Sequence, residues 1–417
     1  MDTIESQHYA LVNTILQDHF GIQKDSFKIS EIEKAKHNHV YLIQLDQPLP
    51  ELPRAKNQSS KPFISAILAG TSKLILRIPK DNVSLEESVR IHNEVAFLAL
   101  ARDALYSIDP LIIPRVFGWE DAPSPSPFGL RWILQEYKEG ESLSPDDLFA
   151  LDDDTQRTLL HQIAQVVKAF QEYQLPESIM YGGLKFDDQG DISSTVTVLP
   201  CGGPFPSYAH FLRGMCTWQL SASERSTHLN GWRDKPKLRK RLDAFFAEGL
   251  DRILAEIPED RPTLVHADIG LPNLLFDCAN GRLTAVLDFG FAHIGAPISE
   301  YLFSFYDIDG LMPGIAQPLG PLRKYMLDGF PAQKKRIETK LKLALAWDNA
   351  LIDVGAKKPS NIPKAGDIAD LWWFSQDLCQ AFWFMDRFLK NRTPAALDKL
   401  KDGSARNLER YLKQWGF

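Results

Sequence analysis

The hydrophobic pattern of the chain changes near residue 137, and this change constrains the fold more than any other feature. Before it, five segments have the length and composition of strands, and a segment of helical spacing lies between the third and the fourth. After it, apolar residues recur mostly at the intervals of amphipathic helices. The pattern predicts an α+β fold with a β-rich lobe, residues 1–137, and a larger, mainly helical lobe, residues 138–417.

Turn residues and periodicity suggest where the elements lie. Strands are expected at residues 27–35, 40–45, 73–79, 114–120 and 131–137. A helix is expected at 8–20, and another from Ser84, where Glu87 would complete a capping box. The Pro-, Ser- and Lys-rich residues 46–68 predict a surface insertion. Further helices are expected at 159–173, at 237–257 and over most of 332–417.

Two apolar runs of the second lobe are interrupted by polar residues. LVHADIGLPNLLFD contains His266, Asp268 and Asn273, and AVLDFGFAHIG places Asp288 fifteen residues beyond Asn273. A hairpin that turns at CANG would bring Asp268, Asn273 and Asp288 together. Carboxylate and amide oxygens are hard ligands that suit Mg²⁺. The spacing H-x-D-x4-N followed by D-F-G is typical of phosphoryl transfer in kinases, whereas His266 and Asp268 taken alone would suggest a turn cap.

HADIGLPN followed by LDFG resembles the aminoglycoside phosphotransferase and choline kinase-like family, whose usual form is HGDLxxxN and then an IDW or DFE-type motif. Members have the protein-kinase fold, with two lobes, and move the γ-phosphate of a nucleotide to a small-molecule hydroxyl. The resemblance extends over roughly residues 25–350. MYGGLKFDDQGDI and CGGPFPSYAHFL are most similar to the fungal-type branch of that family.

The resemblance implies a role for each residue of the two motifs. Asp268 would be the catalytic base, and His266 would brace the loop that carries it. Asn273 and Asp288 would be the metal ligands. The implied cofactors are ATP and Mg²⁺, and the implied partner is a small-molecule acceptor.

Three positions depart from the family pattern. Ala267 replaces the usual glycine, and Glu300 stands where an aspartate often follows the metal motif. In KLILRIPK, Arg77 occupies the place of the phosphate-binding lysine, with Glu94 as its expected helix partner; Lys80 lies past the end of the strand. Because arginine forks onto phosphate or carboxylate, the exchange is compatible with function. The alternative is that Arg77 and Glu94 are ordinary surface charges.

The remaining nucleotide contacts are less clearly marked. EKAKHNHVYLIQL contains no glycine, although Asn38 fits the N-x-V-Y tail of the family's phosphate hairpin. Four basic side chains there would either reach phosphate or be solvated: Lys34, Lys36, His37 and His39. WILQEYKEG is similar to the hinge that holds adenine through backbone groups, which implies Gln135, Glu136 and Tyr137 as nucleotide-binding residues.

Charge and cysteine content exclude several classes of protein. The net charge of −7 argues against general polyanion binding. The basic residues 233–241 are interpreted as the solvated face of a helix. Four cysteines without a CxxC pair favour a reducing compartment over a disulfide framework or a zinc site. Neither a signal peptide nor a membrane span is indicated, so we expect a cytoplasmic protein without nucleic-acid or membrane partners. Nothing in the pattern specifies an oligomeric state.

The function favoured by the sequence is an ATP- and Mg²⁺-dependent small-molecule phosphotransferase. Three carboxylates would attract a cationic acceptor, if they are not simply surface charges: Asp307, Asp309 and Asp348. One alternative is a catalytically inactive kinase-fold binding or scaffold protein, which the glycine-free loop and Arg77 favour. Another is a kinase fold recruited to other nucleotide- or metal-assisted chemistry. Protein kinase activity is disfavoured, because no activation-loop and APE pattern follows Asp288.

Overall fold

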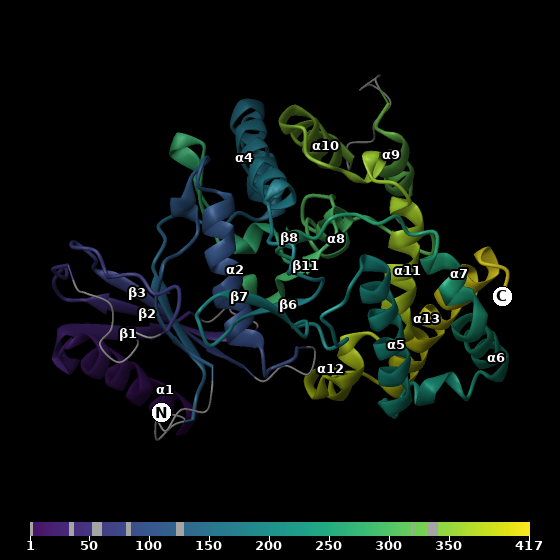
Figure 1. Cartoon of the computed structure of the whole chain (residues 1–417), viewed down its shortest axis with the longest axis horizontal. Helices are drawn as coiled ribbons and strands as arrows, with labels where there is room; N and C mark the ends of the chain where they lie inside the picture. Colours follow the sequence, from purple (N-terminus) through teal and green to yellow (C-terminus); the bar gives the residue numbers. More distant parts are fainter. Residues whose placement is uncertain are drawn as a thin grey trace.

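Two parts of different composition make up the molecule, a smaller one built on a sheet and a larger one built from helices (Figure 1). The computed structural model describes residues 3–32, 37–51, 61–80, 85–121, 129–317, 320–331 and 341–417. The fold is thus α+β and bilobal, as predicted. The last strand of the large sheet ends at Glu136, one residue before the predicted domain boundary, although the boundary itself stays a prediction.

The first lobe is organised by a five-stranded antiparallel sheet. Its strands are β1 (Phe27–Glu31), β2 (Asn38–Leu45), β3 (Lys73–Pro79), β4 (Val116–Glu120) and β5 (Trp132–Glu136), in the order β1-β2-β3-β5-β4. All five predicted strands are therefore present. Residues 52–60 of the predicted insertion lie outside the described residues, and Ile64 and Ile67 near its end are buried. The end of that segment therefore belongs to the core rather than to the surface.

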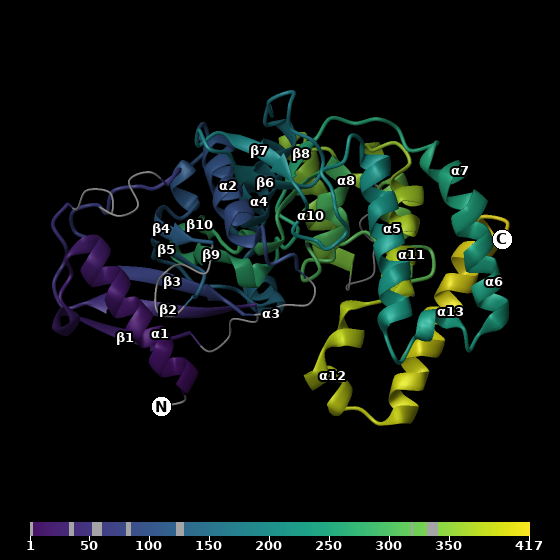
Figure 2. The same cartoon turned by 60° about the horizontal axis from the view of Figure 1, so that its bottom comes forward.

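The two faces of this sheet have different neighbours. Tyr41 of β2 and Leu76 of β3 belong to a core shared with Leu11 and Leu16, so one face is covered by the N-terminal helix. That helix, α1, spans Thr3–Thr14 and continues as a π-helical turn through His19. Figure 2 shows α1 lying along β1, β2 and β3. The opposite face, which carries Arg77, is turned toward α2 and the second lobe.

Helix α2 spans Arg90–Ala104 and packs between the two lobes. The prediction that it begins at Ser84 with a capping box is wrong, although Ser84 itself lies outside the described residues. The N-cap residue is Val89, which makes no side-chain cap. Glu87 cannot serve as the third residue of a cap there, because it precedes the helix and its carboxylate binds the Arg90 guanidinium at 2.9 Å.

The second lobe is mostly helical in the described residues, as its amphipathic pattern predicts (Figure 1). Its helices are α3 (Pro145–Ala150), α4 (Asp153–Glu172), α5 (Tyr208–Arg225), α6 (Pro236–Ala244), α7 (Leu250–Leu254), α8 (Pro297–Phe303), α9 (Leu322–Asp328), α10 (Lys342–Val354), α11 (Ala365–Leu378), α12 (Asp386–Lys390) and α13 (Pro394–Gln414). Trp372 and Trp383 are buried in the core of this lobe, so these aromatic residues serve packing.

Short strand pairs of the second lobe position the polar motifs. They are β6 (Gly183–Phe186) with β7 (Ile192–Thr195), β8 (Thr263–Val265) with β11 (His293–Gly295), and β9 (Leu274–Asp277) with β10 (Arg282–Val286). The β9–β10 hairpin turns at CANG, as predicted. Its last turn residue, Gly281, has a φ of +58°, a left-handed conformation that glycine adopts without steric cost.

None of the helices in the described part of the chain has the length and apolar character needed to cross a bilayer.

Candidate active site

The loop between β8 and β9 is built around the buried His266. Its Nδ1 accepts a hydrogen bond from the backbone N–H of Asp268 at 3.2 Å, so Nε2 carries the proton and donates to the Leu287 carbonyl at 3.0 Å. Burial lowers the pKa of His266 to about 4, which keeps this neutral form at physiological pH. His266 thus ties the loop to the segment before Asp288, the bracing position that the family resemblance implies.

A second brace comes from Glu300 of α8, which is 3% exposed. Its carboxylate accepts the backbone N–H groups of His266 at 2.8 Å and Ala267 at 3.0 Å, and it also accepts the Ser304 hydroxyl. Ser304 in turn accepts the backbone N–H of Ile269 at 2.8 Å. Glu300 therefore holds the loop through its backbone. Its side chain, longer than that of the expected aspartate, makes these contacts.

Ala267 occupies a left-handed backbone conformation, with a φ of +64°. This region favours glycine because the Cβ of other residues crowds the backbone. The two hydrogen bonds that the backbone N–H groups of this turn donate to Glu300 offset that cost. Ala267 therefore replaces the usual glycine at a position where its backbone is strained.

Asp268 and Asn273 are half-buried and are held together by hydrogen bonds. The Nδ2 of Asn273 donates to the Asp268 carboxylate at 2.8 Å and to the Asp268 carbonyl at 2.9 Å. Since the nitrogen of the amide is committed to Asp268, its oxygen is the atom left for a metal. The backbone carbonyl of Asn273 accepts from Leu287, so the residue also fixes the start of the metal motif.

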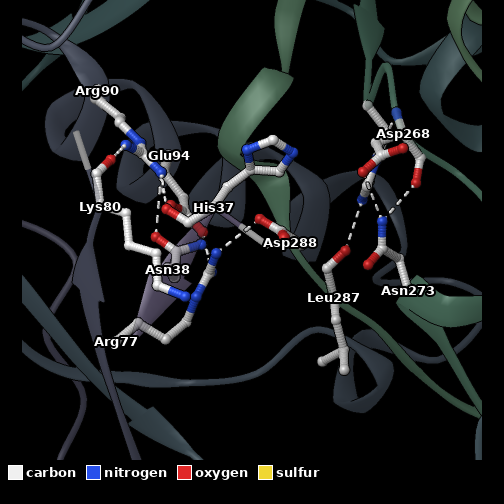
Figure 3. Close-up of polar contacts among 11 residues, drawn as sticks. His37, Asn38, Arg77, Lys80, Arg90, Glu94, Asp268, Asn273, Leu287 and Asp288 are labelled. Carbon is white, nitrogen blue, oxygen red and sulfur yellow. Dashed lines mark hydrogen bonds and ion pairs between the residues drawn. The ribbon is translucent and has the colours of Figure 1, made fainter. Parts of the chain in front are cut away.

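Asp288 follows β10 in a left-handed conformation, with a φ of +61°. Its Oδ1 accepts from Arg77 Nη2 at 2.6 Å, and its side chain remains 29% exposed. The next residue, Phe289, is buried and packs against the His266 ring with a centroid distance of 4.4 Å. Figure 3 shows Asp288 between Arg77 on one side and Asp268 with Asn273 on the other.

Arg77 of β3 joins the two lobes by binding two carboxylates. Its Nη1 donates to Glu94 of α2, as the sequence predicts, and its Nη2 donates to Asp288. Burial opposes ionisation of Arg77, but the charges of Glu94 and Asp288 raise its pKa above the ordinary value. Burial likewise acts to raise the pKa of Asp288, and Arg77 outweighs it and lowers that pKa. One guanidinium is thus shared between the two carboxylates.

The hinge residues lie where β5 leaves the sheet. Gln135 pairs with Ile75 of β3 in the sheet register, and its buried Oε1 has no hydrogen-bond partner within the described ranges. The Glu136 carboxylate accepts the backbone N–H of Arg115 at 3.1 Å. Tyr137 is half-buried and follows directly after the strand. Their nucleotide contacts stay a prediction.

Asn38 has a different environment from the one its predicted role suggests. It is buried, and its Oδ1 accepts from Arg90 Nη2 at 3.2 Å. Arg90 was missed by the sequence reasoning, although it stands one helical turn before Glu94 on the same helix. That i, i+4 spacing is the signal that could have identified it.

The basic residues of the glycine-free hairpin separate into two groups. Lys34 and Lys36 lie outside the described residues. The His39 ring lies 2.7 Å from the Glu31 carboxylate and packs edge-on against the His8 ring of α1. Both contacts are on the face of the sheet away from Arg77. His37 instead contacts the Phe291 ring edge-on at 5.2 Å, beside the Asp288 segment.

Of the three acidic residues considered for the acceptor, Asp307 contacts the catalytic loop. Asp307 Oδ2 accepts the backbone N–H of Leu271 at 2.5 Å, and Asp309 follows two residues later. Asp348 is instead buried and bound to Lys358 at 2.7 and 2.8 Å. The prediction that Asp348 attracts an acceptor is wrong, because its charge is already neutralised inside the protein.

The donor set fits a magnesium ion. Across the described ranges, no three His, Cys, Asp or Glu side chains gather as a metal-binding group. The candidate ligands are therefore one carboxylate, Asp288, and one amide, Asn273. Mg²⁺ prefers a site in which the protein supplies few oxygen ligands and nucleotide phosphates and water complete the coordination shell.

Two surface hollows, of about 750 and 470 Å³, lie elsewhere. The larger is lined by parts of α2, α4 and α10, and the smaller by residues around Tyr181 and Tyr208. None of the predicted site residues lines either of them. The candidate site is therefore defined by the motif residues and not by the size of a hollow.

Residues 64–310 match the sequence model of the phosphotransferase enzyme family, which is more than half of the chain. The chain belongs to this family. The predicted membership is confirmed, and with it the class of a small-molecule phosphotransferase; the fungal-type branch stays a prediction. No curated protein sequence matches this phosphotransferase significantly.

Three solved structures are similar to the phosphotransferase over nearly their whole length. The streptomycin-ATP-APH(2″)-IIa ternary complex is 14% identical, with 98% of each chain covered and a TM-score of 0.47. ADP-bound aminoglycoside phosphotransferase APH(2″)-Ib is 12% identical, with 99% of each covered and a TM-score of 0.45. Choline kinase from Cryptosporidium parvum is 12% identical, with 97% of this chain and 94% of that chain covered and a TM-score of 0.45. Likeness at this level carries no argument about substrate.

Proposed function

We propose that this chain transfers the γ-phosphate of ATP to a hydroxyl of a small-molecule acceptor and requires Mg²⁺. The observation that carries the proposal is the joint position of Asp268, Asn273 and Asp288 beside the Arg77–Glu94 pair. A carboxylate for the acceptor, oxygen ligands for a metal and a cation for phosphate are the parts that phosphoryl transfer needs. Family membership supports the same reaction class.

In the proposed reaction, Asp268 orients the acceptor hydroxyl and takes its proton as the oxygen attacks the γ-phosphorus. The new bond joins the acceptor oxygen to phosphorus, the bond from phosphorus to the β–γ bridging oxygen breaks, and ADP leaves. Asn273 and Asp288 would hold Mg²⁺, which supplies charge neutralisation on the phosphate oxygens. Arg77 would exchange its contact with Asp288 for a phosphate oxygen. Most of the catalysis would come from positioning and electrostatics.

The acceptor is proposed to bind on the side of the loop where Tyr306 and Asp307 lie. A Cβ on Gly270 would come within 2.7 Å of the Tyr306 hydroxyl, so the tyrosine stands close over the loop two residues after Asp268. Burial, followed by the charges of Asp268 and Asp307, raises the pKa of Tyr306 to about 12. Asp307 Oδ1 has no hydrogen-bond partner in the part of the chain that the structure describes. An acceptor with donor or cationic groups fits this side.

Calorimetric titration with ATP and with Mg²⁺ or Mn²⁺ tests the proposal. ATP with Mg²⁺ should bind and should raise the melting temperature, as any ligand that prefers the folded state does. A screen of hydroxyl-bearing metabolites should then give metal-dependent transfer of phosphate. Absence of nucleotide binding with either metal would contradict the proposal.

A second candidate is a kinase-fold binding protein without turnover. The contact between Arg77 and Asp288 favours this second candidate, because a protein cation occupies a proposed metal ligand. The intact Asp268 and Asn273 oppose it. Metal-dependent ATP binding without transfer to any acceptor, and without hydrolysis, would favour this second candidate.

A further inference from the structure

Arg90, the first residue of α2, is 1% exposed and holds the open end of the β2–β3 hairpin (Figure 3). Its Nη2 donates to the carbonyl of His37 at 2.8 Å, and its Nη1 donates to the carbonyl of Lys80 at 2.9 Å. His37 directly precedes β2, and Lys80 directly follows β3. One guanidinium therefore fixes the backbone on both strands at the point where they leave the sheet.

Helix α2 thus binds the hairpin twice, through residues one turn apart. Arg90 holds its end, and Glu94 holds Arg77 in the middle of β3. Both contacts use buried charges, and charge-assisted hydrogen bonds are stronger and more exacting in geometry than neutral ones. The position of the hairpin end relative to Arg77 is consequently fixed by a single rigid helix.

One of the two residues whose backbone Arg90 holds, His37, also reaches the second lobe. The His37 ring packs edge-on against Phe291 with a centroid distance of 5.2 Å, three residues beyond Asp288. In Figure 3 the imidazole of His37 lies on the Asp288 side of the hairpin. A histidine held there stands over the place where Arg77 and Asp288 would meet the phosphates. It ends the connection between β1 and β2, which has no glycine to bring backbone amides close.

We infer that His37 contacts the phosphates of the nucleotide and that Arg90 is the positioning residue that holds it there. The inference rests on the proposed function, because it assigns further residues to the same nucleotide site. It makes His37 a side-chain phosphate ligand, in which an imidazole replaces contacts that a glycine-rich loop makes through its backbone. Because Arg90 and Glu94 share α2, the helix sets the spacing between His37 and Arg77.

Calorimetric titration of the full chain with Mg-ATP and with adenosine tests this, using His37→Ala, Arg90→Met and the double variant. His37→Ala should weaken Mg-ATP binding about tenfold or more, as expected for loss of one contact to a charged group, while adenosine affinity stays within about twofold. Arg90→Met should do the same, and Arg90→Lys should recover part of the affinity. The double variant should be no weaker than Arg90→Met alone, because coupled residues are not additive.

His39→Ala is the matched control, since His39 belongs to the same hairpin but pairs with Glu31 on the other face. It should leave Mg-ATP affinity within about twofold of wild type. Unchanged Mg-ATP affinity in His37→Ala overturns the inference even if Arg90→Met fails to fold. Equal loss of ATP and adenosine affinity, or additive effects in the double variant, also overturns it. A wild-type protein that binds neither ligand overturns the proposed function as well, so the two failures are distinguishable.

Discussion

The two halves of the candidate site are held in place by different forces. The catalytic loop, residues 266–273, is fixed by hydrogen bonds from its own backbone to Glu300 and to Ser304 of the same lobe. The nucleotide side is fixed by guanidinium groups that reach between elements, Arg77 from β3 to α2 and Asp288, and Arg90 from α2 to the hairpin.

Because of this difference, we expect substitutions in the two halves to affect different properties, the stability of the fold in one and nucleotide binding in the other. A loop braced by buried backbone hydrogen bonds is coupled to the folding of its lobe, since each unsatisfied buried N–H costs free energy. Guanidinium groups at a lobe junction can exchange one anionic partner for another. We therefore expect changes at Glu300 to act first on the free energy of unfolding, and changes at Arg77 to act first on nucleotide affinity.

The largest effect is expected from Glu300→Ala. This change leaves the backbone N–H groups of His266 and Ala267 buried without an acceptor, at about 1–3 kcal/mol each. The free energy of unfolding should fall by about 3 kcal/mol in denaturant titration at pH 7. Glu300→Gln keeps one acceptor oxygen and should lose less than the alanine variant. A Glu300→Ala protein as stable as wild type would show that the loop does not depend on this carboxylate.

The titration of Glu300 gives a somewhat smaller, pH-dependent effect. Burial raises its pKa from 4.5 to about 6, so the folded state holds the proton more tightly than the unfolded chain does. The stability from this group is fully present below pH 4.5 and is lost as the pH rises through 6, by about 2 kcal/mol. Relative to Glu300→Gln, wild type should therefore lose about that much stability between pH 4.5 and pH 7. Parallel stability curves for the two proteins would refute the assignment.

On the nucleotide side, Arg77→Ala should weaken Mg-ATP binding more than tenfold, or about 1.4 kcal/mol, because a charge-assisted contact to phosphate is removed. Arg77→Lys keeps a positive charge on β3 and should be tolerated better. Calorimetry measures both. If the alanine variant binds Mg-ATP like wild type, the role of Arg77 is limited to its ion pairs with Glu94 and Asp288.

Sequence reasoning succeeded where the relevant distances are set locally. The spacing from His266 to Asn273 and the tight turn at Gly281 are fixed over a few residues, so the meeting of the motif carboxylates could be predicted. Arg77 and Glu94 followed from the order of strand and helix in the family pattern.

What could not be predicted depends on contacts between distant segments. Two partners of Arg90, His37 and Asn38, lie more than fifty residues away at the start of β2, and the true start of α2 had to be known before the role of Arg90 could be seen. The left-handed turn at Ala267 and its support by Glu300 follow from packing of α8 against the loop. Alternation along a strand likewise did not indicate that His37 and His39 would face different partners.

The most direct test of the account compares Asp268→Asn with Asp288→Asn by Mg-ATP titration and by phosphate transfer, or by ATP hydrolysis until an acceptor is found. Asp268→Asn keeps the shape of the loop but removes the charge that orients the acceptor and takes its proton. It should bind Mg-ATP as wild type does and lose turnover by about 10²-fold or more. Asp288→Asn should lose both turnover and Mg-ATP affinity. Near-wild-type turnover in Asp268→Asn, or an equal loss of affinity in both variants, would contradict the division of roles proposed for this site.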